Sequence, residues 1–153
     1  MNLSELEREY LKTARIGHLA TADTSGRPHV VPVCFAVLEG GIYTPIDEKP
    51  KQTSSNNLRR IRDIKANSAV ALIVDHYTET WDQLGWLQVR GTATIVHPAD
   101  NCHSNAIAGL RSKYDQYKDH TLEERPIIQI EPGHVISWGK IQPELLNNSE
   151  KPH

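Results

Sequence analysis

The sequence predicts a mainly β protein, an antiparallel barrel with helices around it. Seven short segments are apolar or alternate between apolar and polar residues at the two-residue period of a strand. Turn signals containing glycine join several of these segments as hairpins. The expected order is helix, three strands, helix, two strands, helix, two strands, and an antiparallel barrel protects strand edges by closing on itself.

The chain is expected to begin with an amphipathic helix followed by a strand. Apolar residues recur at helical spacing from Leu3 to Ala14. Ser4 and Glu7 fit a capping box, in which each side chain satisfies a backbone N–H of the first turn. Residues 16–22 then predict a short strand.

The next segment predicts a pair of hairpins. Residues 24–28 give a turn signal, and residues 29–38 predict one strand with two apolar faces, which is typical of a strand buried on both sides. Pro32 cannot donate to a ladder, so it indicates a bulge or a sheet edge within this strand. A turn at 39–41 leads into a returning strand over 42–46.

The second half of the chain continues this alternation. Gly91 falls on the inner face of a long alternating strand and indicates a bulge or a close neighbour. From Pro143 the polar sequence predicts a flexible tail (143–153) behind a single domain over 1–142. The expected elements are a helix over 58–64, strands over 69–74 and 85–96, a helix over 98–117 that starts with Pro and Asp, and strands over 127–130 and 135–138 around Pro132-Gly133.

Composition excludes several classes of protein. The 153 residues have the size of one domain, and no apolar run reaches the roughly 18 residues that a membrane-spanning helix needs. The net charge of −2 is unlike that of a globally basic nucleic-acid binder. Two cysteines are too few for a disulfide framework, and the acidic start differs from a signal peptide, so we expect a cytoplasmic protein.

Positive charge is concentrated in one window. Residues 49–65 contain Lys and Arg residues opposed by Asp63 alone, which gives a net charge of about +5 and leaves about −7 for the rest of the chain. Lys49 and Lys51 precede Thr53-Ser54-Ser55, a natural N-cap region for the helix that follows. A helix N-terminus attracts anions, so the window is either a phosphate cradle or a solvated basic helix face.

Other side chains give weaker signals. The eight histidines contain no H-E-x-x-H arrangement and neither cysteine has zinc-ligand spacing, so no metal site is expected. Cys34 lies in an apolar strand and is expected to pack as a small hydrophobe. At least one of the three Trp residues is expected in the core or at a dimer interface. Hydrolase, P-loop and Rossmann motifs do not occur.

Several short segments, taken in order, match one known family. Ser25-Gly26-Arg27-Pro28 and Pro32-Val33-Cys34-Phe35 stand first, and residues 43–51, Asn57-Leu58-Arg59-Arg60 and residues 69–72 follow. Arg90-Gly91-Thr92-Ala93 and Ile136-Ser137-Trp138-Gly139 close the series. From about Ile16 to Gly139, the chain resembles the pyridoxamine 5′-phosphate oxidase-like flavin-binding split barrels.

This resemblance implies a split barrel of six or seven strands that forms a homodimer, with two cofactor sites between the subunits. It also implies an oxidoreductase that transfers hydride or electrons between FMN or the deazaflavin coenzyme F-420 and a small organic substrate. Because such a cofactor carries the chemistry, the lack of a catalytic motif fits. We expect the backbone around Pro32, Val33, Thr44, Pro45 and Ile46 to line the ring, and Lys49, Lys51 and Thr53 to bind the phosphate.

One position bears on the choice of cofactor. In the oxidases proper, an arginine three residues after the proline of the hairpin turn contacts the FMN phosphate, whereas this chain has Val31 three residues after Pro28. The Pro32-Val33-x-Phe35 pattern resembles instead the deazaflavin-using branch. Coenzyme F-420 has an acidic oligoglutamate tail, which a groove bearing Lys49, Lys51, Arg59 and Arg60 would attract. The balance favours F-420 over FMN.

Other functions stay open at this point. One is an FMN-binding protein of the same fold, either a pyridoxamine phosphate oxidase-like enzyme or a non-catalytic flavin carrier. Another is a small β-barrel that uses the basic helix on nucleic acid, whose binding would fall steeply with salt. The acidic remainder of the chain and the lack of patterned surface aromatics argue against nucleic acid.

Overall fold

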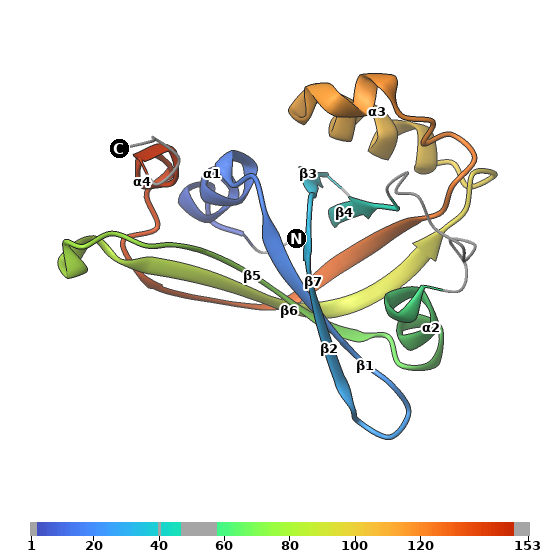
Figure 1. Ribbon diagram of the computed structural model, residues 1–153, viewed down its shortest axis with the longest axis horizontal. Coiled ribbons are helices and arrows are strands. Elements are labelled where there is room, and N and C mark those ends of the chain that lie inside the picture. The colour runs from blue at the N-terminus through green and yellow to red at the C-terminus, as the bar shows by residue number, and fades with distance from the viewer. Residues whose placement is uncertain (1–2, 40, 47–57, 149–153) are drawn as a thin grey trace.

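A computed structural model describes residues 3–39, 41–46 and 58–148. In these residues one seven-stranded sheet has the order β2-β1-β5-β6-β7-β4-β3, and all neighbours are antiparallel (Figure 1). The strands are β1 (Gly17–Ala22), β2 (Pro28–Val33), β3 (Ala36–Leu38), β4 (Gly41–Pro45), β5 (Ala69–His76), β6 (Gly85–Val96) and β7 (Ile127–Gly139). The helices are α1 (Glu5–Thr13), α2 (Arg59–Ala66), α3 (His103–Lys113) and α4 (Pro143–Asn148), with short 3₁₀ helices η2 (Trp81–Gln83) and η3 (Asp115–Asp119).

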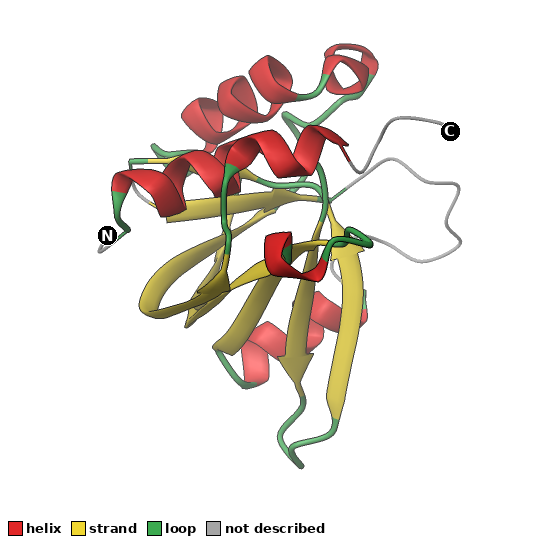
Figure 2. Cartoon of the chain, turned by 90° about the vertical axis from the view of Figure 1, so that its left-hand side faces the viewer, coloured by secondary structure: helices red, strands yellow, loops and turns green. Residues whose placement is uncertain are grey.

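The sheet curls into a half-barrel whose two edge strands follow one another in the chain. The edge strands β2 and β3 are joined by Cys34 and Phe35 and are not paired with each other in the described residues. The helices α1, α3 and α4 lie on the same side of the sheet, and α2 lies apart from them (Figures 1 and 2). The predicted class is therefore confirmed as a split barrel with peripheral helices, but the sheet does not close by pairing its edges.

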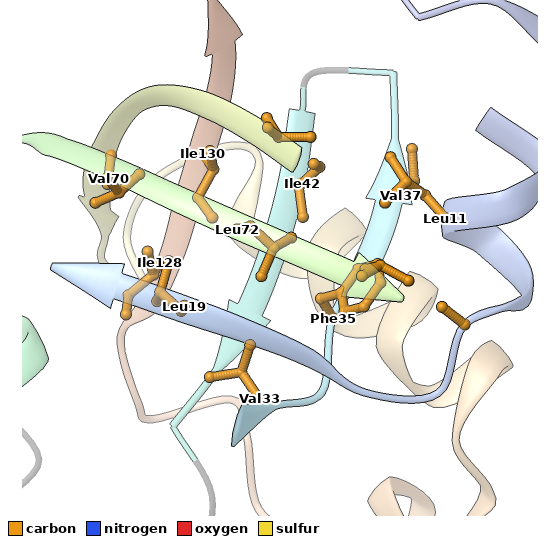
Figure 3. Packing of buried hydrophobic residues seen from close by; sticks show 14 of the residues in the cluster. Leu11, Leu19, Val33, Phe35, Val37, Ile42, Val70, Leu72, Ile128 and Ile130 are labelled. Atoms are coloured by element: carbon orange, nitrogen blue, oxygen red, sulfur yellow. The ribbon is translucent and has the colours of Figure 1, made fainter. Parts of the chain in front are cut away.

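Side chains from opposite sides of the curl fill one interior (Figure 3). Leu19 of β1, Leu72 of β5 and Ile128 of β7 are almost completely buried in it. A second cluster lies under α3, where Leu110 packs with residues such as Tyr43 of β4. Fully burying one such side chain is worth about 1.5–3 kcal/mol, so the alternating pattern of the strands directly determines which face turns inward.

Three local expectations are confirmed. The capping box of α1 is present, with the Glu7 N–H donating to Ser4 Oγ at 3.1 Å and the Ser4 N–H donating to Glu7 Oε1 at 2.9 Å. Gly26 takes a positive φ of 78° in the turn before β2. At Gly91 the pairing of β6 with β7 shifts register, and a side chain there would collide with the carbonyl oxygen of Glu131.

The predicted strand over 29–38 is wrong in two respects. It is broken into β2 and β3 by Cys34 and Phe35, and β2 is largely exposed, with Val30 63% exposed. The reason is its place at the edge of the sheet, which Pro32 had indicated. A strand that is apolar on both faces can thus be an edge strand, with one of its faces exposed in the single chain.

The predicted pair of strands around Pro132-Gly133 is one continuous strand, β7. Pro132 does not form a turn, because it lies opposite Gly91 at the register shift of the β6–β7 ladder. The register shift leaves the next residue, Gly133, unpaired, so the ladder is already irregular where proline lacks its N–H.

Both internal helices begin later than expected. The first residue of α3 is His103, because Pro98 and Asp100 belong to a turn in which the His97 N–H donates to Asp100 Oδ2. The N-cap of α2 is Leu58, which makes no side-chain cap, so Thr53-Ser54-Ser55 is not the N-cap of this helix. Local side-chain hydrogen bonds and tertiary contacts set these ends, and the sequence pattern does not distinguish them.

The expectation of a flexible tail from Pro143 is also wrong for the described residues. Residues Pro143–Asn148 form α4, which lies beside α1 (Figure 1). Leu146 and the preceding Ile141 are buried in the main core. Two apolar side chains were enough to fix a segment that is otherwise polar.

The expectation of a tryptophan in the core is not met within the chain. Trp81 is 70% exposed and Trp138 is 53% exposed, while Trp86 is half-buried and lies opposite Trp138 across β6 and β7. Placement at a dimer interface stays a prediction.

Candidate functional site

The predicted ring-lining residues lie at the ends of β2 and β4. Pro32 and Val33 end the edge strand β2, and Thr44, Pro45 and Ile46 run past the start of β3, where Ala36 pairs with Tyr43. Both Val33 and Ile46 turn their side chains into the main core. The two strand ends therefore meet beside the split of the barrel.

The edge of β2 that faces away from β1 makes no strand pairing in the described residues. Its ladder with β1 pairs His18 with Pro32 and Gly17 with Val33. An edge strand presents N–H and C=O groups that can bond to another chain or to a ligand. This free backbone is the feature that the predicted contacts at Pro32 and Val33 require.

Thr44 has an unsatisfied hydroxyl. The residue is 1% exposed, and Thr44 Oγ1 has no hydrogen-bond partner within the described part of the chain. A buried polar group without a partner costs about 1–3 kcal/mol, and such groups concentrate at functional sites. Thr44 lies two residues from Ile46, where the described segment stops, so a polar ligand atom at this end of β4 would find a partner.

The predicted phosphate contacts Lys49, Lys51 and Thr53 lie in residues 47–57, outside the described residues. The basic helix that follows them is described. A cavity of about 430 Å³ opens between α2 and the β1–β2 turn, and Arg27, Arg59 and Arg62 are among its lining residues. This cavity places three guanidinium groups on one surface.

Acids partly neutralise these arginines. Asp63 is buried and accepts a hydrogen bond of 2.8 Å from Thr21 Oγ1, and Arg59 Nε lies 3.5 Å from the same carboxylate. Arg27 Nε lies 2.9 Å from Asp23, whose pKa is lowered, chiefly by the Arg27 backbone N–H. Asp63 thus fastens α2 to β1. It lies outside the stripe of Leu58, Ile61 and Ile64, so the helical pattern gave no signal of this role.

A second group of residues was missed by the sequence analysis. Arg15, Cys34 and Tyr114 line a separate cavity where the end of α1, the β2–β3 linker and the end of α3 meet. The Phe35 N–H donates to the Tyr114 hydroxyl at 3.1 Å, and this hydroxyl can donate to Arg15 O at 3.0 Å. These residues are far apart in the chain, so no local pattern could have grouped them.

A buried pair joins α1 to the long hairpin. The Tyr10 hydroxyl lies 2.8 Å from His76 Nδ1, and His76 Nε2 lies 2.6 Å from the carbonyl oxygen of Gln83. Because that carbonyl only accepts, Nε2 carries the proton and Tyr10 donates to Nδ1. Burial, and secondarily Asp75, raises the pKa of Tyr10. This pair is a structural connection.

The described residues lack two features. They contain no group of three or more His, Cys, Asp or Glu side chains that could hold a metal ion. None of their helices has the length and apolar character needed to cross a membrane.

Comparisons with known proteins agree with this architecture. The family model for pyridoxamine 5′-phosphate oxidase matches residues 3–139. The 5a,11a-dehydrotetracycline/5a,11a-dehydrooxytetracycline reductase of Streptomyces rimosus is 27% identical over 139 residues, which are 91% of this chain and 84% of that protein.

Two solved structures are similar in fold. A conserved hypothetical protein of Mycobacterium tuberculosis has a TM-score of 0.71 at 20% identity and covers 99% of this chain and 90% of its own. The heme storage protein HutZ of Vibrio cholerae has a TM-score of 0.68 at 18% identity, with 92% and 96% covered. At these identities the likeness establishes the fold alone.

Proposed function

Because the chain belongs to the pyridoxamine 5′-phosphate oxidase family, we propose that it is an oxidoreductase that uses a flavin or deazaflavin cofactor on a small organic substrate. The family match over residues 3–139 carries this proposal, since it spans every strand of the half-barrel. The Streptomyces rimosus relative is named a reductase, which favours catalysis over cofactor storage.

Coenzyme F-420 is the proposed cofactor. Val31 occupies the position at which the oxidases proper carry their phosphate-binding arginine, and it pairs with Leu19 and packs against the apolar core. A valine side chain can neither donate a hydrogen bond to the FMN phosphate nor pair with its charge. Arg59 and Arg62 are exposed beside the cavity on α2, and their charges favour a cofactor with an extended acidic tail.

The described residues fit such a cofactor at two points. The unsatisfied Thr44 hydroxyl and the free backbone edge at Pro32 and Val33 could each take a polar atom of the ring. Lys49 and Lys51 stay the predicted phosphate contacts, with Thr53. The bound cofactor would supply the hydride or electron chemistry, while the chain binds it, orients it and excludes water.

A symmetric homodimer, with cofactor sites between its subunits, is the proposed assembly. Val30 on β2 and Trp138 on β7 are mostly exposed, and Trp81 lies in η2, at the tip of the projecting β5–β6 hairpin (Figure 1). Large exposed apolar groups mark interfaces, and twofold symmetry is the commonest way for copies to associate. Sedimentation should give about twice the 17.2 kDa chain mass, and a monomer at micromolar concentration would contradict a shared site.

Separate titrations with F-420 and FMN, followed by visible absorbance, test the cofactor. We expect F-420 to bind with a Kd below about 100 μM, or about −5.5 kcal/mol, and FMN to bind more weakly. Tighter binding of FMN would contradict the choice of F-420. Binding of neither, or of heme alone, would contradict the oxidoreductase. Binding without reduction or oxidation of any supplied organic substrate would indicate a carrier.

A further inference from the structure

The second cavity, which we call the Arg15 pocket, has a volume of about 390 Å³. Its lining includes Arg15, Cys34, Tyr114, Tyr117 and His120. Cavities of roughly 300–1,000 Å³ with aromatic walls and a few convergent polar groups are typical of small-molecule sites. This pocket has the size and composition of a site for a ligand with a single ring.

The two cations at the Arg15 pocket have no carboxylate beside them in the described part of the chain. Neither Arg15 nor the neighbouring Lys113 lies within 4.0 Å of a carboxylate in the described part of the chain. Asp115 also lines the pocket, but its side chain is 91% exposed and Lys118 lies 3.1 Å away. Arg15 is therefore a lining cation without an acid partner in the described part of the chain.

Aromatic rings hold these two cations in place. The guanidinium carbon of Arg15 lies 4.6 Å from the centre of the Tyr114 ring, and Lys113 Nζ lies 4.0 Å from the centre of the Phe35 ring. Arg15 uses one nitrogen to donate to Lys113 O at 3.0 Å, which leaves most of its five N–H donors for a ligand. The arginine is thus oriented before any anion arrives.

Lys113, next to Arg15, is a second source of positive charge near the pocket. Burial, with a smaller effect of the Arg15 charge, lowers its pKa to about 7, and Cys34 acts in the opposite direction. A lysine in this condition is only partly protonated near neutral pH. An anion nearby would favour its charged form and be attracted by it in return.

His120, another lining residue, has an unsatisfied ring nitrogen. Its Nδ1 is buried and has no hydrogen-bond partner within the described residues. Its ring packs edge-on against Tyr117, and Arg111 Nη2 donates to the His120 carbonyl oxygen at 2.8 Å. The ring is therefore held beside Tyr117, and its buried Nδ1 lacks a partner within the described residues.

We propose that the Arg15 pocket binds a small organic anion with a planar ring, with the acidic group on Arg15 and the ring against Tyr114 and Tyr117. Charge-assisted bonds from a guanidinium fork favour a carboxylate, and aromatic walls favour a flat apolar body. Cys34 directly follows Val33 in the chain, so the pocket adjoins the segment predicted to line the cofactor ring. That this anion is the substrate rests on the proposed function, whereas its binding does not.

Protection of the two cysteines from alkylation tests the proposal on the full chain without added cofactor. Cys34 lines the pocket, whereas Cys102 precedes α3 and does not line it, so Cys102 is an internal control. Benzoate at about 20 mM should slow alkylation of Cys34 by iodoacetamide about threefold or more, and neutral benzamide should not. Mass spectrometry reads both sites. No protection of Cys34, or equal protection by benzamide or at Cys102, would overturn the proposal.

A pair of variants tests whether Arg15 is the cation that binds the anion. Arg15→Gln should weaken benzoate binding about tenfold in calorimetry, because it removes the charged fork, while Lys12→Gln should leave it unchanged within about twofold. Lys12 is an exposed cation at the same end of α1 and does not line the pocket. Equal losses in both variants would overturn the role of Arg15. If Arg15→Gln fails to fold, the alkylation of the unaltered chain still decides the matter. Because neither experiment needs cofactor, their failure is distinguishable from failure of the oxidoreductase proposal.

Discussion

Cations lie together at the α2 surface and at the Arg15 pocket, but the two regions differ in whether acids lie beside those cations. On the α2 surface, Arg59 lies 3.5 Å from Asp63 and Arg27 lies 2.9 Å from Asp23, so acids stand beside the cations. In the Arg15 pocket, Arg15 lies over an aromatic ring, and no carboxylate stands within ion-pair distance of it in the described part of the chain. The first region has more charges, and the second leaves its charges less compensated.

This difference shows that a count of cations in a sequence window does not measure the attraction for an anion. Ion pairs near solvent contribute about 0–1 kcal/mol and are screened by salt. Arg15 is exposed, but the neighbouring Lys113 is half-buried and has no acid partner in the described part of the chain. A charge in such a position keeps more of its field, because the surrounding dielectric is lower. The α2 surface suits an extended acidic tail, whereas the Arg15 pocket suits one compact anion.

Removing the acid that anchors the first region should have the largest effect. Asp63→Ala takes away the acceptor of the Thr21 hydroxyl and the partner of Arg59 in a buried position. We expect the free energy of unfolding to fall by about 2–4 kcal/mol, measured by urea denaturation. Asp23→Ala is the control, since its carboxylate is near solvent, and it should cost far less. Equal losses would contradict the anchoring role of Asp63.

Replacing both predicted phosphate contacts should separate cofactor binding from folding. Lys49→Ala with Lys51→Ala should weaken cofactor binding about tenfold or more, because hydrogen bonds to charged groups are worth about 1.5–3 kcal/mol each. Stability should change within about 0.5 kcal/mol per site. The loss of affinity should shrink at high salt, which screens the wild-type attraction. Unchanged affinity would place the phosphate elsewhere, for instance at Arg59 and Arg62.

The lowered pKa of Lys113, beside the Arg15 pocket, should make the free energy of unfolding depend on pH. The pKa of Lys113 is lowered from 10.5 to about 7 in the folded chain, chiefly by burial, so between these values the unfolded chain binds more protons. The free energy of unfolding therefore rises with pH in this window. From pH 7 to pH 9, the unaltered chain should gain about 1–2 kcal/mol relative to Lys113→Met, by denaturant titration at each pH. Parallel curves for the two proteins would mean that Lys113 keeps its ordinary pKa.

Much of the fold could be read from the sequence because it depends on local patterns. The Ser4–Glu7 capping box involves neighbours three residues apart, and the alternation along β6 selects its inner face without reference to the rest of the chain. Gly91 indicated a close approach between two strands, because only a residue without a side chain fits beside the carbonyl oxygen of Glu131. The family resemblance similarly rests on short segments in a fixed order, which the match over residues 3–139 confirms.

The errors fall where distant contacts outweigh local ones. The sequence around Pro132 predicts a turn, yet Pro132 lies within β7, opposite β6 at a register shift. The polar stretch from Pro143 forms α4, in which Leu146 packs into the main core beside α1. The apolar strand before Phe35 was expected to be buried, but its place at the sheet edge leaves Val30 exposed.

The sequence by itself determined the class of fold, the family and the basic window, since each depends on residues that are near one another in the chain. Even the two ion pairs beside α2, Arg27 with Asp23 and Arg59 with Asp63, join residues four apart in the chain. Only the tertiary structure decided what else these charged groups contact and how deeply they are buried. Asp63 reaches Thr21 across 42 positions, and Tyr114 reaches Phe35 across 79 positions and Arg15 across 99. The field at a site depends on the burial around its charges as well as on the distances between them, and that burial is not encoded in the spacing of residues along a chain.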